Sequence, residues 1–153
     1  MTKQEFLQKA TAAALASSRT NGLSAGVTVA QAVLESNWGQ SLLARDAHNY
    51  FGIKAHGGGD RVAYPTCEVV NGRTVRVTAE FARYASMEEC FADRDRLILS
   101  LACYAEARTA KGNPEQFAHA LAKHWATEPR YAEKLLAVYR TNGLSEIEQH
   151  LHH

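Results

Sequence analysis

Residues 26–39 have the sequence GVTVAQAVLESNWG, which predicts a helix from Gly26 to about Asn37. Its apolar residues surround nearly the whole circumference: Val27, Val29, Ala30, Ala32, Val33 and Leu34. A helix that is apolar on all sides belongs in a protein core. Gly39 provides its C-terminal stop. We therefore expect a core helix here, with one acidic residue, Glu35, close to its end.

Glu35 is the first candidate for chemistry. At the C-terminal end of an apolar helix the macrodipole is negative and water is scarce, and both effects raise the pKa of a carboxyl group. A carboxylic acid that stays protonated near neutral pH can donate a proton to the leaving oxygen of a sugar linkage, as glycoside hydrolysis requires. The alternative is an acid at the exposed rim of its helix, paired with Arg45 or with a backbone donor.

A β-hairpin is predicted further along the chain. From Arg73 to Phe81 apolar and polar residues alternate, and the preceding Asn71-Gly72 suits a two-residue type I′ turn. This turn pairs Val70 with Arg73, Val69 with Thr74 and Glu68 with Val75. Glu68 then shares the inward face, where it could hold a carboxylate across a cleft from Glu35. The alternative is a bulge that slips the register by one residue and turns Glu68 outward.

The remaining elements are helical. Thr2 and Glu5 have capping-box spacing before a helix to about Ser18, and Ser41 can cap a turn over Leu42 to Arg45. Ser86 and Glu89 form a second capping box, for one long helix to about Arg108. Asn113 with Pro114 starts another, and Pro129 opens a last helix that reaches Tyr139 and is closed by Gly143. The expected fold is α+β: one mainly helical domain, residues 1–143, with one inserted β-hairpin and a C-terminal tail, residues 144–153, part of which could derive from an expression vector.

Composition excludes several classes of function. Among 153 residues, Lys plus Arg is 17 and Asp plus Glu is 16, so no strong field is available to gather nucleic acid or an anionic membrane surface. No apolar run approaches the length of a membrane span, and the N-terminus lacks the layout of a signal peptide. We expect a soluble chain as written. If its substrate lies in the periplasm or cell wall, a secretion machine, a phage lysis system, or an additional leader or partner domain must deliver it.

Neither a metal site nor a disulfide framework is expected. His119 and His124 are five residues apart, off the spacing that places two ligands on one helical face. His150, His152 and His153 lie in the terminal segment and could capture a metal adventitiously. Three cysteines, Cys67, Cys90 and Cys103, lack paired spacing, so buried free thiols are expected, with a single disulfide as the alternative.

A family resemblance is carried by two motifs in sequence. AQAVLESNWG, residues 30–39, followed by NYFGIK, residues 49–54, resembles the N-acetylglucosaminidases of glycoside hydrolase family 73, such as the flagellar muramidase-like domain. Thr66-Cys67-Glu68, residues 81–84 and ATEPRY, residues 126–131, look like that family's hairpin and late-helix motifs. The likeness covers roughly residues 5 to 140.

The resemblance implies a lysozyme-like fold and hydrolysis of the β-1,4 bond between N-acetylglucosamine and N-acetylmuramic acid in peptidoglycan glycan strands. No cofactor is implied, and we expect a monomer. Glu35 matches the family's general acid, Glu68 its second carboxylate on a mobile hairpin, and Tyr131 a tyrosine beside the reacting sugar. Glu68 either activates water as a base, the role we favour, or assists attack by the substrate's own acetamide.

Several other side chains are candidates for binding sugar. Aromatic rings can offer flat faces to pyranose rings, and the candidates are Tyr50, Phe51, Tyr84 and Trp125, with Trp38 as a further aromatic. Core packing is the alternative for each of them, and for Phe51 and Trp38 it takes the form of a buttress to the Glu35 helix. Asn49 could orient the acetamide or cap a turn.

Three other functions compete with glucosaminidase activity. A muramidase or a lytic transglycosylase shares the same core and dominant acid but breaks the other glycosidic linkage. A catalytically silent wall-binding module is the alternative from a different class, and the retention of Glu68 argues against it.

Overall fold

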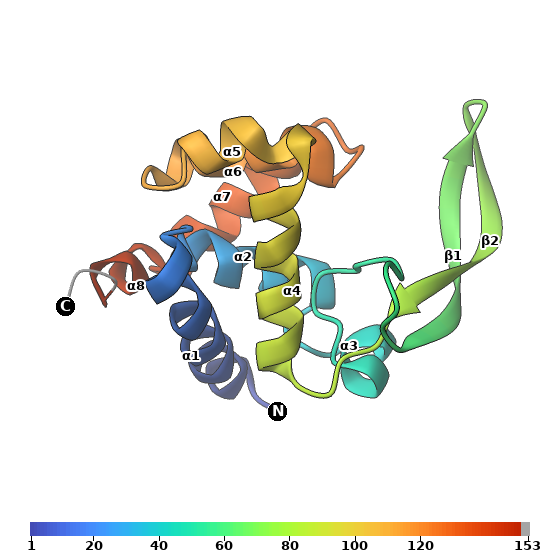
Figure 1. Ribbon diagram of the computed structural model, residues 1–153, viewed down its shortest axis with the longest axis horizontal. Helices are drawn as coiled ribbons and strands as arrows, with labels where there is room; N and C mark the ends of the chain where they lie inside the picture. The colour runs from blue at the N-terminus through green and yellow to red at the C-terminus, as the bar shows by residue number, and fades with distance from the viewer. Residues whose placement is uncertain (151–153) are drawn as a thin grey trace.

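The computed structural model describes residues 1–150 and shows a body of helices from which one β-hairpin projects (Figure 1). The helices are α1 (Lys3–Asn21), α2 (Ala25–Ser36), α3 (Leu42–Ala47), α4 (Met87–Ser100), α5 (Ala105–Thr109), α6 (Pro114–Trp125), α7 (Tyr131–Thr141) and α8 (Ser145–Gln149), with a 3-10 turn η1 (Ala102–Tyr104). The strands β1 (Arg61–Val70) and β2 (Arg73–Ala82) form the only sheet in these residues. The prediction of a mainly helical α+β architecture is confirmed.

Helix α2 is the centre of the body, as its sequence predicts. Ten of its twelve residues are buried, and α1, α6, α7 and α8 all pack against it. Figure 1 shows α2 behind α4, with α1 on one side and α7 on another. Ser24 caps its N-terminus by accepting a hydrogen bond from the amide of Val27. Because α2 is enclosed on nearly all sides, only its C-terminal end can reach a surface.

The predicted N-terminal caps are confirmed. Thr2 and Glu5 form a complete capping box, and Ser41, Ser86 and Asn113 each accept a backbone amide at the start of a helix. Helix α1 runs past the expected end at Ser18 to Asn21 and stops at Gly22, whose φ is 76°.

The prediction of a single long helix from Ser86 to Arg108 is wrong. Helix α4 ends at Ser100, and Leu101 is extended, with φ −77° and ψ 135°. The guanidinium of Arg108 donates to the carbonyls of Ile98 and Leu101, at 2.7 and 2.8 Å, and so satisfies two carbonyls freed by the break. The chain then continues through η1 into the short helix α5.

The C-terminal part differs from expectation in two ways. The last predicted helix begins at Tyr131 rather than at Pro129. Residues expected as a tail form a further helix, α8, in which Leu144 and Ile147 are buried against the core. The folded domain therefore extends beyond residue 143. His152 and His153 lie outside the described residues.

The hairpin has the predicted register. Val70 pairs with Arg73, Val69 with Thr74 and Glu68 with Val75, so no bulge turns Glu68 outward. Asn71 and Gly72 both have positive φ, 52° and 76°, as a type I′ turn requires. One face of the hairpin, which includes Glu68, is half-buried along its length, whereas the other is exposed. The strands stand beside the helical body rather than inside it (Figure 1).

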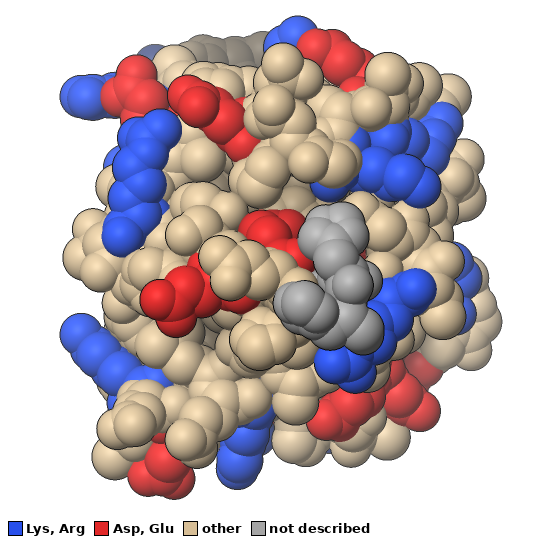
Figure 2. All heavy atoms as spheres, turned by 90° about the vertical axis from the view of Figure 1, so that its left-hand side faces the viewer, with Lys and Arg blue, Asp and Glu red and all other residues tan. Residues whose placement is uncertain are grey.

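The surface shows no dominant charge on the face of the molecule that carries α1 and α8. Figure 2 shows basic and acidic side chains interspersed there. Within residues 1–150, no helix is long and apolar enough to cross a membrane, and no group of His, Cys, Asp or Glu could hold a metal ion.

The expectation that the cysteines are buried free thiols is correct for only one of the three. All are free thiols, but only Cys90 is buried; Cys67 and Cys103 are exposed. Cys67 lies on the outward face of β1, where alternation turns every second side chain to solvent, and Cys103 lies in η1.

Candidate active site

Glu35 lies in the last turn of α2, and its side chain is half-buried. Immediately after it, Asn37, Trp38 and Gly39 adopt positive φ values of 48°, 62° and 78°, so the chain turns away from the helix axis. No Lys or Arg of residues 1–150 forms an ion pair with Glu35, so the pairing with Arg45 considered above is not observed.

Tyr131 meets Glu35 from the first residue of α7. Tyr131 is buried, with 4% of its surface exposed, and its hydroxyl lies close enough to the Glu35 carboxyl for each group to affect the pKa of the other. Burial raises the pKa of Glu35 above its ordinary value, and the hydrogen bond from Tyr131 opposes part of that rise. Burial and the adjacent Glu35 charge also raise the pKa of Tyr131, which therefore remains a hydroxyl. The structure thus brings together two of the three residues expected to be catalytic.

Gly52 lies next to Glu35 and is part of the wall of a pocket. Its φ is +68°, and a Cβ built on it would lie 3.9 Å from Oε2 of Glu35, close enough for van der Waals contact. Gly52 is also part of the lining of a pocket of about 350 Å³. Its other lining residues are Ile53, Lys54, Ala55, His56, Leu97, Leu101, Tyr104 and Trp125. Glu35 therefore lies next to a residue of the pocket wall but is not itself one of the lining residues, and Trp125 is part of that wall.

Glu68 is connected to the same pocket by an ion pair with Lys54. The Nζ atom of Lys54 lies 2.7 Å from Oε1 of Glu68, and Lys54 lines the pocket. The Glu68 side chain is 38% exposed. No hydrogen bond or ion pair within the described chain joins Glu68 to Glu35 directly. Lys54 belongs to the NYFGIK motif, but the sequence alone did not indicate its ion pair with Glu68.

Asn49, Tyr50 and Phe51 are structural in this fold. The Asn49 amide donates to the carbonyls of Ile53 and Ala82, both at 2.9 Å, and its oxygen accepts the amides of Phe51 and Ile53. Tyr50 and Phe51 are 5% and 1% exposed and pack on Phe91. The turn-capping and core-packing alternatives describe these residues, so we do not include them among the substrate contacts.

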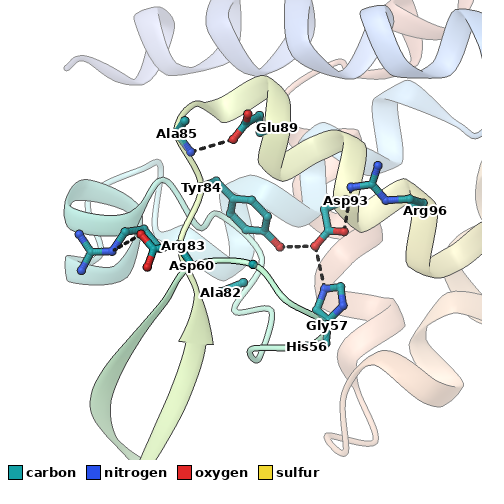
Figure 3. Close-up of a pocket in the computed structure, with 11 residues that line it drawn as sticks. His56, Gly57, Asp60, Ala82, Arg83, Tyr84, Ala85, Glu89, Asp93 and Arg96 are labelled. Atoms are coloured by element: carbon teal, nitrogen blue, oxygen red, sulfur yellow. Dashed lines mark hydrogen bonds and ion pairs between the residues drawn. The ribbon is translucent and has the colours of Figure 1, made fainter.

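Tyr84 lies in a second, larger pocket of about 530 Å³ between the base of the hairpin and α4 (Figure 3). Its hydroxyl donates to Oδ2 of Asp93 at 2.6 Å, and His56 and Arg96 contact the same carboxylate. Burial favours a neutral Asp93, but these three hydrogen bonds outweigh it and hold the Asp93 pKa below its usual value. His56 is shared with the pocket beside Glu35, so the two hollows adjoin.

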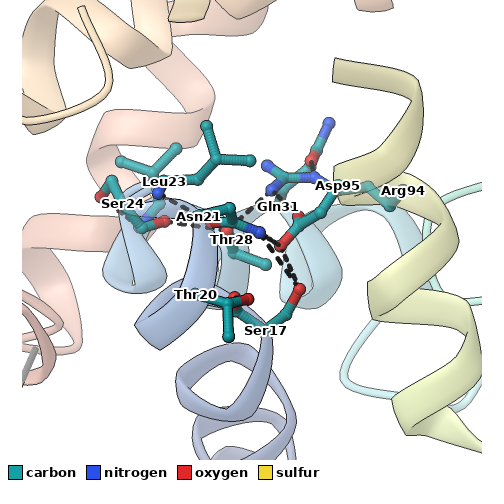
Figure 4. A network of polar contacts seen from close by, with 10 residues as sticks. Ser17, Thr20, Asn21, Leu23, Ser24, Thr28, Gln31, Arg94 and Asp95 are labelled. Atoms are coloured by element: carbon teal, nitrogen blue, oxygen red, sulfur yellow. Dashed lines mark hydrogen bonds and ion pairs between the residues drawn. The ribbon is translucent and has the colours of Figure 1, made fainter. Parts of the chain in front are cut away.

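A buried polar network underlies the acid. Arg94, on α4, is fully buried and donates from Nε to Oε1 of Gln31 at 2.9 Å, and from Nη1 to Thr28 and Asp95 at 2.8 Å each. Nε2 of Gln31 in turn donates to the Tyr131 hydroxyl at 3.2 Å. Figure 4 shows the network running from α1 through α4 to α2. The guanidinium also lies over the rings of Phe51 and Phe117.

Sequence reasoning missed this network, although one signal was available. The buried residues of α4 include Met87, Cys90, Phe91, Arg94 and Ile98, which follow helical spacing. Arg94 thus occupies a position in an otherwise apolar stripe. A charged residue there needs buried partners, and the partners come from helices that only the tertiary structure brings together.

Comparisons with known proteins find relatives of this chain. The chain matches the glucosaminidase family, described as mannosyl-glycoprotein endo-beta-N-acetylglucosaminidase, over residues 11–144. It is 35% identical to the peptidoglycan hydrolase FlgJ of Vibrio cholerae over 89% of this chain and 42% of that protein. It is 34% identical to the exo-glucosaminidase LytG of Bacillus subtilis over 80% of this chain and 45% of that protein. The chain therefore spans less than half the length of these two relatives.

A solved structure shares the fold. The catalytic domain of the autolysin Auto from Listeria monocytogenes superposes with a TM-score of 0.84 at 28% identity, covering 95% of this chain and 86% of that one. The expected lysozyme-like α+β fold is confirmed by this match.

Proposed function

This chain belongs to the glucosaminidase family, glycoside hydrolase family 73, and from that premise we propose that it hydrolyses peptidoglycan glycan strands with Glu35 as the general acid. We further propose that it cleaves the β-1,4 bond between N-acetylglucosamine and N-acetylmuramic acid. The observation that carries the proposal is a half-buried carboxyl group of raised pKa at the end of an apolar helix, next to Gly52, which lines a pocket.

The acid is suited to its role by its surroundings. Protonating the glycosidic oxygen requires a carboxyl group that keeps its proton near the working pH. Burial at the end of α2 favours the protonated form of Glu35 and outweighs the opposing effect of the Tyr131 hydroxyl, so the pKa of Glu35 stays raised. Gly52 adds no side chain between the acid and the pocket. Tyr104 and Trp125 offer aromatic surface to a sugar ring on the pocket wall.

Glu68 is proposed to assist attack on the anomeric carbon, as a base for water or in support of the substrate's acetamide. It is carried on the hairpin, at a position that the register turns toward the half-buried face. Its ion pair with Lys54 must loosen or be shared when Glu68 engages water or substrate. We therefore assign Lys54 the role of holding this carboxylate beside the pocket until substrate arrives.

The proposed substrate also implies the compartment in which the enzyme works. Peptidoglycan lies outside the cytoplasmic membrane, so the enzyme would act in the periplasm or the cell wall, delivered by a secretion-system or phage partner, or by a longer precursor. We propose that the catalytic domain works as a monomer, because the residues assigned to the reaction all come from one chain.

The products of a digest test the proposed linkage. Purified peptidoglycan is incubated with the protein, and the fragments are reduced and identified by mass spectrometry. Fragments that end in reducing N-acetylglucosamine are expected. Reducing N-acetylmuramic acid would instead identify a muramidase, and anhydromuramic acid a lytic transglycosylase. Binding to peptidoglycan without any fragments would identify a silent wall-binding module.

A further inference from the structure

The hollow of about 530 Å³ between the base of the hairpin and α4 is not used by the reaction proposed above. Its volume lies within the range of pockets that bind small molecules. It adjoins the pocket that Gly52 lines, because His56 belongs to the walls of both. A branch of the substrate that leaves the first pocket past His56 therefore enters the second.

One wall of this hollow is a polar face of α4. Glu89, Asp93 and Arg96 all line the hollow, and their spacing of four and three residues places them on the same side of the helix. The Asp93 side chain is only 10% exposed, and Tyr84 and His56 bond to its Oδ2 at 2.6 and 2.8 Å (Figure 3). The carboxylate in the middle of this face is therefore held in place.

Arg96 is the donor that this arrangement leaves open to the hollow. Its Nη2 lies 3.1 Å from Oδ1 of Asp93, the only ion-pair partner of Arg96 within residues 1–150, and its side chain is 70% exposed. A guanidinium has five N–H donors in a planar fork, so donors remain for a second carboxylate. Such charge-assisted contacts between arginine and a carboxylate are frequently bidentate. Because Asp93 anchors one side of the guanidinium, less side-chain freedom is lost when a ligand binds.

The two adjoining hollows differ in chemistry. The pocket that Gly52 lines includes the rings of Tyr104 and Trp125, which suit a sugar. In the larger hollow the one phenol or indole ring is Tyr84, whose hydroxyl is already bonded. The charged residues that line it are Asp60, Arg83, Glu89, Asp93 and Arg96. The larger hollow therefore suits a ligand with charges of both signs better than it suits a neutral sugar.

The proposed substrate has a branch of this kind. In peptidoglycan, N-acetylmuramic acid carries a short stem peptide on its lactyl group, and this peptide has free carboxylates and an amino group. The bond proposed for cleavage joins N-acetylglucosamine to N-acetylmuramic acid, so a stem peptide leaves the strand from a sugar at the cleaved bond. Extended residues, at about 3.3–3.6 Å each, carry its carboxylates well beyond the sugar ring.

We propose that the hollow between the hairpin base and α4 is a subsite for the stem peptide, and that Arg96 binds a carboxylate of that peptide. This inference rests on the function proposed above and names a part of the substrate that is recognised beside the cleaved bond. Tyr84, Asp93 and His56 hold Arg96 in position for this contact. The enzyme therefore prefers strands that still carry their peptides.

The kinetic test uses two forms of one substrate. Soluble glycan strands that carry stem peptides are compared with the same strands after an amidase has cut the bond between the lactyl group and the peptide. The wild type should have a kcat/KM roughly tenfold higher on peptide-bearing strands, the effect of one charge-assisted contact. Arg96→Gln, which removes the charge, should lose this preference through a higher KM, because the contact lies away from the reacting atoms.

Arg19→Gln is the matched control. It removes an exposed arginine at the end of α1, which lies away from the hairpin (Figure 1), and it should keep the wild-type preference. The amidase leaves the lactyl carboxylate on the stripped strands. If the hollow bound that carboxylate, or further sugars, Arg96→Gln would slow cleavage of both substrates equally. That result would overturn the proposal, and so would equal wild-type rates on the two substrates.

A binding measurement separates this proposal from the proposed function. The wild type is titrated with N-acetylated L-alanyl-γ-D-glutamyl-L-lysyl-D-alanine, and the backbone amide signals are followed by ¹H–¹⁵N NMR. The amides of Gly57 and Ala85, which line the hollow, should shift, and the same peptide with its carboxylates amidated should leave them in place. Cleavage of neither strand would count against the proposed function. The peptide titration would still decide about the subsite, and unmoved Gly57 and Ala85 signals would refute it.

Discussion

Glu35 shows how much of a residue's chemistry is set by its position in an element. An acid in the middle of α2 would be buried without access, and one at the position of Asn37 would be exposed. In the last helical turn it is half-buried, with Tyr131 on one side and a pocket reached past Gly52 on another. This combination of restricted water and open access is what a general acid needs.

The raised pKa has a consequence for stability. Because the folded-state pKa of Glu35 lies above its unfolded value, the folded state binds more protons between the two, and stability falls as pH rises through that window. Above the window the penalty is fully present. Glu35→Gln removes it, so thermal unfolding at pH 7 should show a higher Tm for the variant; in a domain of this size a Tm rises by a few degrees for each kcal/mol of added stability, taken as about 2–4 °C.

The comparison at low pH is the control for this prediction. Below about pH 3, more than one unit under the ordinary Glu pKa of about 4.3, the carboxyl group is protonated in both the folded and the unfolded state, so wild type and Glu35→Gln should unfold at nearly the same temperature. The exposed Glu146→Gln should show little difference at either pH. A Glu35→Gln variant that is less stable than the wild type at pH 7 would contradict the description of the site.

Single residues also mark how far the sequence could go. Glu35, Glu68 and Tyr131 stood out because each lies in a motif or breaks an apolar pattern, and the structure places Tyr131 next to Glu35. Arg94 stood in no motif. Its hydrogen-bond partners Gln31 and Thr28 lie on α2, 63 and 66 residues away, and its neighbour Asp95 accepts from Ser17 on α1, 78 residues away. Such contacts depend on the packing of helices, which local pattern does not specify.

At the scale of elements, the seam between α2 and α8 holds the N-terminal end of the central helix. The Glu148 carboxylate accepts the amide of Gly26 and the hydroxyl of Ser24, where the positive end of the helix dipole favours an anion. Gly26 is closely covered there: a Cβ on it would lie 2.6 Å from Oε1 of Glu148 and 2.6 Å from the Leu144 carbonyl oxygen.

Gly26→Ala should therefore destabilise the protein, although alanine is the better helix former. Overpacking typically costs about 1–3 kcal/mol, more than the roughly 1 kcal/mol that alanine gains over glycine in a helix. Chemical denaturation should show a lower midpoint. Gly112→Ala is the matched control, since nothing lies within 4 Å of a Cβ at that site, and it should be neutral or slightly stabilising. Equal midpoints for the two variants would show that α8 does not cover α2 closely.

The boundaries of elements were predictable where their causes are local. Ser41, Ser86 and Asn113 cap helices through a side chain within three residues, and Asn71-Gly72 sets the hairpin turn by its own backbone conformation. The break at Leu101 was not predictable in this way. It is stabilised by Arg108, which reaches back from the next helix to the carbonyls at the end of α4.

At the scale of the whole molecule, the fold delivers three elements to one place. The end of α2 brings the acid, the start of α7 brings its hydroxyl partner, and the loop before the hairpin brings Gly52 and Lys54 (Figure 1). The hairpin itself extends beyond the helical body and carries Glu68 on the face that is half-buried. The catalytic assignment requires all of these to cooperate, with Glu35 as the indispensable group.

The most direct test of that assignment is the rate at which reducing ends are released from purified peptidoglycan by the wild type and by Glu35→Gln. Substrate binding is measured in parallel by co-sedimentation, because the variant keeps the size of the side chain. We predict unchanged binding and a rate lower by at least about a hundredfold, the lower range for loss of a general acid. Release of reducing ends by Glu35→Gln at the wild-type rate would contradict the account.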